Sequence, residues 1–554
     1  MAQGADAVAA KKAPAPARQP DGGTERLGDL TEEWVFRLLL AEIAAQRGEQ
    51  EFAAQTYLDA AKRTRDKATA KRATELALLA RNPQSAIEAA GLWLELEPGS
   101  IPARQTLVAM LFNTDRLADA RPHLERLLAA EKNAGSVFFQ ISGWLARNPN
   151  RTAVLELLRG LAAKHPDVPE ARFVVAQAAA TAGNEALALA EARAAAELKP
   201  DWEAPVLFQA QLLQRKAPGE ALDFLRDYLA THPKAKDARL HYGRLLAAAG
   251  RAAEAKAEFE QLARDYPAQP EVALAVGLLS LQLKDLQTAE TYLRRALDLN
   301  YADADAVRFY LGQVAEQQKR PDQAIEWYGA VEKGNQHVPA QIRLASVLAK
   351  QGKLEQARER LKKATARSIP ERVQLAQAEA QILRDAREYQ QSYQVLEEAL
   401  NRFPDQPELL YDQAMAAERL NRLDVLETNL RRVMQLQPNH AHAYNALGYS
   451  FADRNERLEE AEQFIDKGLS LAPEDPFILD SKGWVLYRRG RITESLDYLE
   501  RAARLRADPE IAAHLGEVLW AAGRQEDARR VWQEAAQQQP DNDLLRQTLK
   551  KFLP

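Results

Sequence analysis

The chain has 554 residues, of which 46% are hydrophobic, 28% are charged and none is cysteine. The apolar share is that of a folded protein and excludes wholesale disorder, and the absence of cysteine excludes disulfides, thiolate metal sites and a cysteine nucleophile. With 74 basic and 79 acidic residues, the net charge of −5 argues against a sequence-independent nucleic-acid binder, which needs a basic face.

Residues 1–27 differ in composition from the rest of the chain. They are rich in alanine, proline, lysine and glycine and show no apolar periodicity, which predicts a disordered, semi-extended tether. The start of the chain lacks the basic and then apolar profile of a signal peptide. It fits either a mature terminus with an added Met1 or a plain cytosolic start. No apolar run reaches the ~18–20 residues that a membrane-spanning helix needs.

The sequence after the tether repeats itself with a period of about 34 residues. One marker is a proline after an expected helix end, and a second, independent marker is a glycine inside an apolar stretch. Both markers keep the same period, which indicates a solenoid of repeated units. The prolines are Pro166, Pro200, Pro233, Pro267, Pro404, Pro438, Pro473 and Pro540, and the glycines are Gly243, Gly277, Gly312, Gly448, Gly483 and Gly516.

The residue types at fixed positions are typical of the tetratricopeptide repeat, a pair of packed helices. In the last repeat Gly516 is followed by Gly523, Ala528, Trp532 and Pro540. The first glycine permits close approach between helices, and the second can adopt a positive φ that ends the first helix. The proline ends the second helix before the next repeat begins.

We therefore predict an all-α, right-handed superhelical solenoid over residues 28–540, built from about 15 tetratricopeptide-like helical hairpins. Residues 541–554 are amphipathic and predict a C-terminal helix that caps the apolar face of the last repeat. No break in composition marks a second fold.

The first helices of such a stack line a concave groove, and positions 2, 5, 9 and 12 of each first helix are expected to face it. Tyrosine and tryptophan supply contact area at low entropic cost, and asparagine and aspartate can bind a peptide backbone. The alternative is that single aromatic side chains pack between adjacent first helices. Earlier repeats are rich in alanine at these positions, which predicts a smoother face there. The predicted groove residues are Tyr411, Asn445, Tyr449, Asp480, Trp484, Tyr487 and Trp520.

The sequence shows no catalytic constellation. Its eight histidines form no HExxH pair, and His440 and His442 point to different faces of a helix. Phosphate-binding loops and a nucleophile elbow are also absent from the sequence. We predict a protein that is not an enzyme, uses no cofactor or metal, and has protein partners rather than nucleic acid.

Several stretches carry a family resemblance. They are His442–Tyr449, Ile478–Gly490 and Ala512–Trp520 near the C-terminus, and Leu38–Gly48 followed by residues 53–66 near the N-terminus. Together they make the chain similar to the proteobacterial tetratricopeptide outer-membrane lipoproteins that serve as adaptors of a periplasmic carboxyl-terminal processing protease. The resemblance spans nearly the whole chain and is strongest at its two ends.

The resemblance implies a non-enzymatic spiral adaptor that binds and activates the protease and brings it protein substrates such as peptidoglycan cross-link hydrolases. It also implies that Leu38–Gly48 and the helices near it engage the protease, with Leu38, Leu39, Glu42 and Ile43 as contact residues, while the groove receives the substrate. The alternative function is a structural scaffold for an envelope or secretion complex, without a role in proteolysis.

The resemblance also bears on localisation. The adaptor family is anchored through a lipidated cysteine after the signal peptide, whereas this sequence contains no cysteine. Either the anchor was removed with a leader, and the native precursor is periplasmic and attached to the outer membrane, or the protein is soluble. It is cytoplasmic if no leader was removed. A chain without cysteine suits an oxidising compartment.

Overall fold

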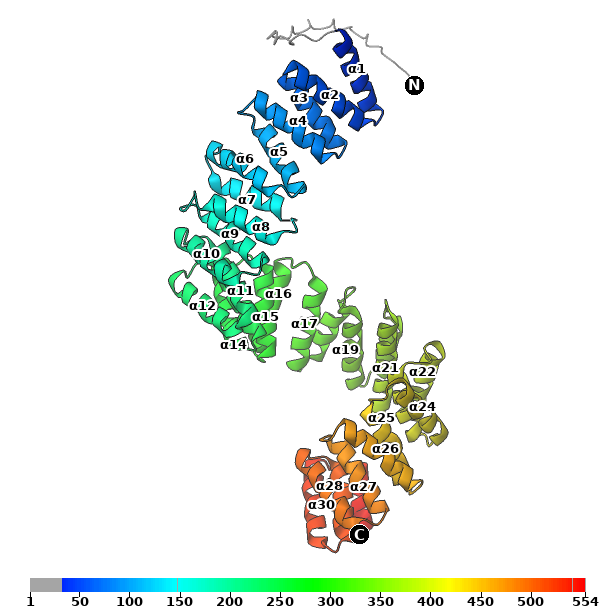
Figure 1. Cartoon of the computed structure of the whole chain (residues 1–554). Coiled ribbons are helices and arrows are strands. Elements are labelled where there is room, and N and C mark those ends of the chain that lie inside the picture. Colours follow the sequence, from blue (N-terminus) through cyan, green and yellow to red (C-terminus); the bar gives the residue numbers. More distant parts are fainter. Residues whose placement is uncertain (1–31, 147, 541, 554) are drawn as a thin grey trace, which may run out of the picture. The chain divides into compact units, whose positions relative to one another are not determined.

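The computed structural model describes residues 32–146, 148–540 and 542–553. Over these ranges the chain forms 31 α-helices and no β-strand (Figure 1). Helices α1–α30 follow one another as 15 hairpins, and α31 comes after the last pair. Most helices pack on the next, and first helices of neighbouring hairpins, such as α25 and α27, also touch. The prediction of an all-α solenoid of about 15 hairpins is confirmed.

The helices group into two compact units, Met1–Glu258 and Phe259–Pro554, called here the first and second unit. The boundary falls inside α14 (Ala252–Asp265). In a solenoid each hairpin packs mainly on its neighbours in sequence, so a compact unit consists of hairpins that follow one another in the chain. The periodicity of residues 28–540 is continuous across this boundary and gives no sign of it.

Helices of the first unit often begin at a side chain that caps them. Asn82 Oδ1 accepts a hydrogen bond from the Ser85 backbone N–H at 3.1 Å, which satisfies one of the donors left unpaired at a helix start. The helices are α1 (Glu32–Gln46), α2 (Gln50–Thr64), α3 (Lys67–Leu79), α4 (Pro83–Leu96), α5 (Ile101–Asn113), α6 (Leu117–Ala130), α7 (Ala134–Leu145), α8 (Arg151–Ala162), α9 (Pro169–Thr181), α10 (Glu185–Leu198), α11 (Glu203–Lys216), α12 (Pro218–Thr231) and α13 (Lys236–Ala248).

First helices of the second unit are followed by a residue with positive φ, which is a glycine in three of them. Gly490 and Gly523 both have φ of 79°, so their predicted role is confirmed. The helices are α15 (Pro270–Gln282), α16 (Leu286–Asp298), α17 (Ala304–Gln317), α18 (Pro321–Gly329), α19 (His337–Lys350), α20 (Leu354–Lys363), α21 (Ile369–Asp385), α22 (Tyr389–Arg402), α23 (Pro407–Arg419), α24 (Leu423–Leu436), α25 (Ala441–Asp453), α26 (Leu458–Leu471), α27 (Pro476–Arg488), α28 (Ile492–Leu505), α29 (Pro509–Ala521), α30 (Gln525–Gln538) and α31 (Asp543–Phe552).

The glycine in the middle of a first helix lies where the second helix of the same hairpin passes closest. A Cβ atom added to Gly483 would lie 2.5 Å from Leu499 Cγ, and one added to Gly448 would lie 2.6 Å from Ile465 Cγ1. These distances are far below van der Waals contact, so a larger residue would force the two helices apart. The expected close approach is confirmed, and its partner is the second helix of the same hairpin.

The last helix, α31, lies against the last hairpin. The ring centroid of Phe552 is 5.3 Å from that of Trp532 and 5.7 Å from that of Trp520. Leu545 of the same helix is 1% exposed. These contacts cover apolar surface that the final hairpin would otherwise present to water.

Two predicted segments lie wholly or partly outside the described residues. The tether at residues 1–27 is wholly outside them, and the capping segment 541–554 is described from residue 542 to residue 553.

Candidate functional site

Five side chains from three consecutive first helices meet in the second unit. Asp480 Oδ2 on α27 lies 2.9 Å from His514 Nδ1 on α29. The Tyr449 hydroxyl on α25 donates to Glu510 Oε1 at 3.2 Å and lies 3.5 Å from His514 Nε2. The Trp484 ring stacks on the His514 imidazole, with centroids 4.2 Å apart and an angle of 23° between the planes. These five residues are called here the His514 cluster.

Two predicted groove residues are buried in this cluster. Asp480 is 4% exposed and Trp484 is 5% exposed, so the prediction that they face an open groove is wrong. The reason is that α25 and α29 both pack on α27, so the first helices on either side cover its positions 5 and 9. The alternative, in which such aromatics pack between first helices, holds for Trp484.

The His514 cluster favours a protonated imidazole. Burial lowers the pKa of His514, but the charge and hydrogen bond of Asp480 raise it, aided by the Glu510 and Asp453 carboxylates, and the net pKa is above the ordinary value. The protonated ring donates from Nδ1 to Asp480 and presents an Nε2 donor to the Tyr449 hydroxyl. A chain of polar contacts therefore links three hairpins.

Three predicted groove residues, Tyr411, Asn445 and Tyr487, are half-buried. The Tyr411 ring lies 5.1 Å from His440 and the Tyr487 ring 5.4 Å from Trp484, measured between centroids. Burial raises the pKa of both tyrosines, so their hydroxyls remain donors at neutral pH. Asn445 Oδ1 is buried without a partner among the described residues. Tyr449 of the His514 cluster is half-buried as well. These four residues are therefore the part of the predicted groove that stays partly exposed.

Trp520, also predicted for the groove, belongs to the aromatic contacts under the C-terminal helix. Its ring centroid lies 6.0 Å from Trp532 and 5.7 Å from Phe552 of α31. Its contacts are therefore those of a packing residue, because α31 lies against the side of α29 that carries it.

A second aromatic surface lies on first helices of the first unit, and the sequence did not predict it. Phe139 of α7 and Phe173 of α9 approach the Trp202 ring edge-on, at centroid distances of 6.1 Å and 5.0 Å. Phe208 of α11 lies 5.7 Å from Phe173. Phe139 is 42% exposed. These four residues are called here the aromatic row.

The aromatic row corrects the expectation of a smooth, alanine-lined face in the earlier repeats. The signal for it was present, because Phe139 and Phe173 occupy the same position one 34-residue period apart. These helices are rich in alanine, and their overall composition therefore suggested a smooth face. Composition does not reveal a single position that is aromatic in successive repeats.

The first helix exposes an apolar stripe. Val35, Phe36, Leu39, Leu40 and Ile43 are all between 44% and 67% exposed. Their spacing of one, three or four residues places them on one side of α1, while α2 packs on another side. These five residues are called here the α1 stripe. Contiguous exposed apolar surface of this kind marks interaction sites.

The four predicted protease contacts divide into two kinds. Leu39 and Ile43 belong to the α1 stripe, whereas Leu38 is half-buried. The Glu42 carboxylate accepts hydrogen bonds from Arg72 of α3 at 2.8 Å and 2.9 Å, and from a tyrosine hydroxyl of α2 at 2.8 Å. The Arg72 hydrogen bonds are the main cause that lowers the pKa of Glu42. Glu42 therefore fixes α1 against its neighbours.

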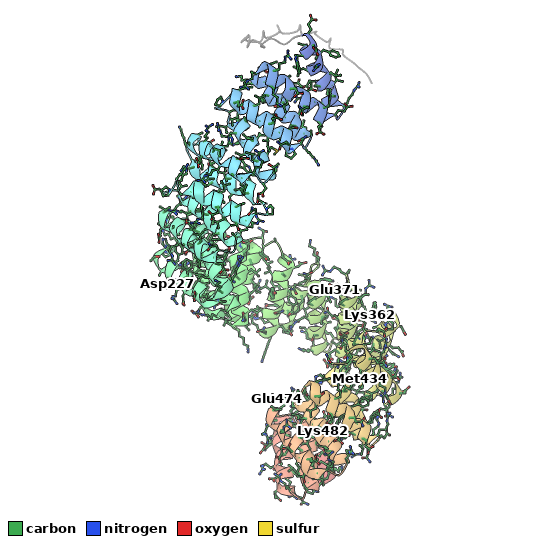
Figure 2. The ribbon with its side chains drawn as sticks, viewed as in Figure 1. Asp227, Lys362, Glu371, Met434, Glu474 and Lys482 are labelled. Carbon is green, nitrogen blue, oxygen red and sulfur yellow. The ribbon has the colours of Figure 1, made fainter. Side chains whose placement is uncertain are left out.

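An ion-pair network stabilises helices α26, α27 and α28. Lys482 Nζ lies 2.6 Å from Glu462 Oε1 and 2.7 Å from Asp466 Oδ1, and Arg491 Nη1 lies 2.9 Å from Glu462 Oε1. Figure 2 labels Lys482 within the second unit. Burial favours the neutral acid of Glu462, but the surrounding cations hold its pKa below the ordinary value. These paired charges are structural.

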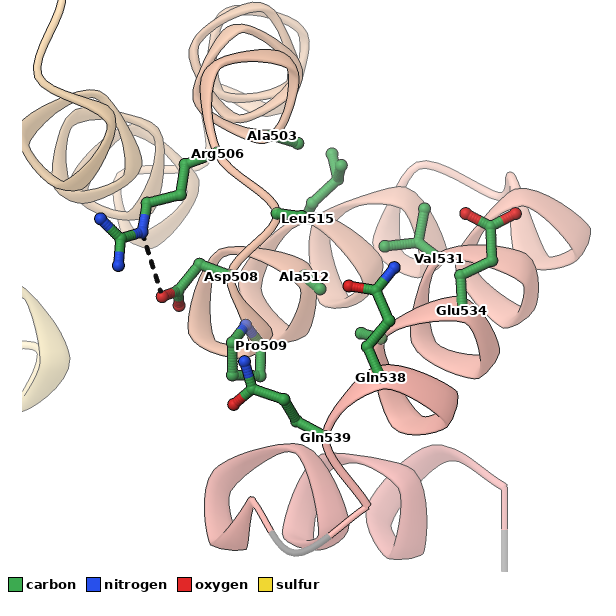
Figure 3. A pocket seen from close by; sticks show the side chains of 12 residues that line it. Ala503, Arg506, Asp508, Pro509, Ala512, Leu515, Val531, Glu534, Gln538 and Gln539 are labelled. Atoms are coloured by element: carbon green, nitrogen blue, oxygen red, sulfur yellow. Dashed lines mark ion pairs between the residues drawn. The ribbon is translucent and has the colours of Figure 1, made fainter. Parts of the chain in front are cut away.

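A hollow of about 170 Å³ lies among α28, α29 and α30 (Figure 3). Leu515 and Val531 supply apolar surface, and Gln538 lies on the polar side. The ion pair between Arg506 Nε and Asp508 Oδ2, at 3.8 Å, is the dashed line in Figure 3. Glu534 and Gln539 also line the hollow, so its surface is partly apolar and partly polar.

Two further findings concern residues 32–146, 148–540 and 542–553. Nowhere in these ranges do three or more histidine, cysteine, aspartate or glutamate side chains gather as a metal site would require. None of the helices there combines the length and the apolarity needed to cross a bilayer.

Comparison with known proteins identifies the family. Sequence profiles of the tetratricopeptide repeat match residues 150–201, 212–279, 274–337 and 481–543, and a profile of the coatomer epsilon subunit matches residues 330–482. The TPR repeat-containing protein PA4667 of Pseudomonas aeruginosa is 35% identical over 496 residues, which cover 89% of this chain and 83% of that protein. The chain belongs to the tetratricopeptide repeat protein family of this relative. Its repeats make it a scaffold for protein–protein interaction.

Other similarities are more distant. The aspartyl/asparaginyl beta-hydroxylase of Mus musculus is 25% identical over 232 residues, which cover 39% of this chain and 31% of that protein. Among solved structures, yeast Tom70 is 15% identical with a TM-score of 0.34, over 94% of this chain and 99% of that chain. The thermophilic tetratricopeptide protein TTC0263 of Thermus thermophilus is 22% identical with a TM-score of 0.30, over 31% of this chain and 95% of that chain.

Proposed function

We propose that this chain is a non-enzymatic adaptor that binds and activates a periplasmic carboxyl-terminal processing protease and presents protein substrates to it, such as peptidoglycan hydrolases. It acts in the periplasm, and its native precursor is anchored at the outer membrane. Two facts support this proposal. The repeats form a protein-binding scaffold, and Leu38–Gly48 and the C-terminal stretches resemble the adaptor lipoproteins.

The observation that carries the proposal is the α1 stripe, which lies within and just before the segment that the resemblance assigns to the protease. Full burial of one leucine or phenylalanine side chain contributes about 1.5–3 kcal/mol. Covering five such side chains can therefore drive association even after the entropic cost of binding. Because Glu42 and Arg72 hold α1 in place, the stripe is presented in a fixed orientation.

The substrate would bind elsewhere on the chain. The aromatic row offers exposed ring surface at Phe139, and the second unit offers the half-buried Tyr411, Asn445 and Tyr487. Aromatic rings suit apolar side chains of a bound polypeptide, and the amide and hydroxyls suit its backbone.

The test is the rate at which the purified protease degrades a candidate peptidoglycan hydrolase as the full chain is added over a concentration series. We expect the wild-type chain to accelerate degradation. A double variant in the stripe, Leu39→Glu with Ile43→Glu, should lose this effect because two charges then face the partner. The matched control is Leu79→Glu with Leu198→Glu, two leucines of the first unit that are 58% and 42% exposed but lie outside the stripe.

The control variant should activate as the wild type does. If the wild-type chain leaves the degradation rate unchanged at every concentration, the adaptor function is wrong. If the stripe variant and the control variant both activate fully, the protease binds elsewhere on the chain.

A further inference from the structure

A second hollow, of about 260 Å³, lies where two consecutive second helices end early. Helix α18 has 9 residues and α20 has 10, whereas α16 before them has 13 and α22 after them has 14. About one helical turn is therefore missing from each of two neighbouring hairpins. The space left between the helix ends is called here the α18–α20 hollow.

Two polar atoms that line this hollow are buried without a hydrogen-bond partner among the described residues, Arg360 Nε and His337 Nε2. Gln341, which is 5% exposed, also lines the hollow. A buried polar group without a partner costs about 1–3 kcal/mol, so native structures rarely leave one, and two around one hollow indicate a ligand.

The wall of the hollow is held in place by its own hydrogen bonds. Asp305 Oδ2 accepts from the backbone N–H groups of Glu332 and Lys333, at 3.2 Å and 2.9 Å. His337 Nδ1 lies 3.0 Å from the Val331 carbonyl oxygen. Since a carbonyl can only accept, Nδ1 carries a proton, and Nε2 is an acceptor whenever the ring is neutral. The hollow is therefore preformed, and the position of His337 Nε2 in it is fixed.

The charges around the hollow define the ligand class. Arg360 has no acidic partner among the described residues, whereas Lys363 pairs with Glu359 Oε1 at 2.6 Å. A guanidinium group binds a planar carboxylate through two parallel hydrogen bonds. The exposed Glu332 also lines the hollow, and its charge opposes a second negative charge on the ligand. A singly charged carboxylate fits this arrangement better than a phosphate dianion.

We propose that the α18–α20 hollow binds a monocarboxylate that carries a hydrogen-bond donor next to its carboxyl group, as a hydroxy acid or an acylated amino acid does. Arg360 binds the carboxylate, the neighbouring donor faces His337 Nε2, and the Gln341 amide completes the polar contacts. The volume of about 260 Å³ is below the about 300–1,000 Å³ of pockets for drug-sized ligands, so the ligand is a small molecule or the end of a polypeptide.

The test is calorimetric titration of the full chain at neutral pH, without any protease, so its outcome does not depend on the proposed function. The probes are lactate, N-acetyl-Ala-Ala, the same dipeptide with an amidated C-terminus, and inorganic phosphate. We expect lactate or the free dipeptide to bind, and the amidated dipeptide and phosphate to bind at least about tenfold more weakly. Binding of lactate identifies a free small acid as the source, and binding of the dipeptide alone identifies a chain end.

Variants assign the binding to the hollow. Arg360→Gln should weaken binding at least about tenfold, and Gln341→Met, which keeps the size but removes the amide, about threefold to tenfold. Arg372→Gln is the matched control, because it removes the same charge from an exposed position on α21 outside the hollow. Unchanged melting temperatures would show that all variants fold. The proposal is overturned if no carboxylate binds, if phosphate binds best, or if Arg360→Gln binds as the wild type does.

Discussion

The aromatic row and the His514 cluster are both built on first helices of consecutive hairpins, one in each unit, but their chemistry differs. In the aromatic row, Phe139 and Phe173 meet Trp202 edge-on, and Lys199 Nζ lies 5.3 Å from the centroid of the Trp202 ring. In the His514 cluster, Trp484 lies flat on an imidazole that pairs with Asp480. Ring–ring contacts do not depend on protonation, whereas the imidazole–carboxylate pair does.

The two regions also differ in what they leave open. Phe139 is 42% exposed and can meet a partner, but Trp484 is 5% exposed and is already covered by its own chain. An aromatic residue at a groove position is therefore available for binding only where the neighbouring first helices leave it uncovered. The position of a residue within the repeat therefore defines which helix carries its side chain. The packing of the neighbouring helices defines whether that side chain is exposed to a partner.

The largest expected effect comes from removing the buried ring of the His514 cluster. We predict that Trp484→Ala lowers the free energy of unfolding by about 3–5 kcal/mol, because it leaves a cavity and an uncovered imidazole. Denaturant unfolding followed by circular dichroism measures this loss. A small change in stability together with a loss of substrate binding would mean that Trp484 faces an open groove, as the sequence suggested. The His514 cluster and the aromatic row would then both be binding surfaces.

A second prediction concerns the pH dependence of the cluster. The folded-state pKa of His514 is raised above the ordinary value, so the pair with Asp480 stabilises the fold fully below about pH 6.5 and loses this contribution as pH rises through the folded-state pKa. A double-mutant cycle of His514→Gln and Asp480→Asn should give a coupling of about 1–3 kcal/mol at pH 5.5 and less at pH 9. The variant His442→Gln, at an exposed histidine outside the cluster, serves as control. Equal coupling at both pH values would contradict the protonated pair.

The smallest expected effect on stability belongs to the aromatic row. Phe139→Ser should lower the free energy of unfolding by no more than about 1.5 kcal/mol, because the exposed ring loses mainly its edge-on contact with Trp202. It should weaken substrate binding equally at pH 6 and pH 8.5, which fluorescence anisotropy with a labelled substrate can measure. A loss of stability of more than about 3 kcal/mol would make Phe139 a core residue and the two regions alike.

The hairpin architecture could be predicted because its signals are local. Gly483 and Gly490 act within one hairpin, at the contact between its two helices and at the turn between them, so the spacing of glycines reveals both roles. The candidate site could be predicted only in part. Tyr411, Asn445 and Tyr487 keep some exposure, but Asp480 and Trp484 are covered by helices from neighbouring hairpins.

The sequence by itself determined the helical hairpin, its period, the number of repeats and the absence of a catalytic motif, since each of these depends on residues within about one repeat. The tertiary structure alone decided that His514 meets Asp480, 34 residues away, and that the Tyr449 hydroxyl reaches Glu510, 61 residues away. It also decided that the short helices α18 and α20 leave a hollow, and that the Nε atom of Arg360, which lines it, has no hydrogen-bond partner among the described residues. The physical reason is that burial and pairing are properties of neighbouring hairpins packed together, and the pattern within one repeat does not contain them.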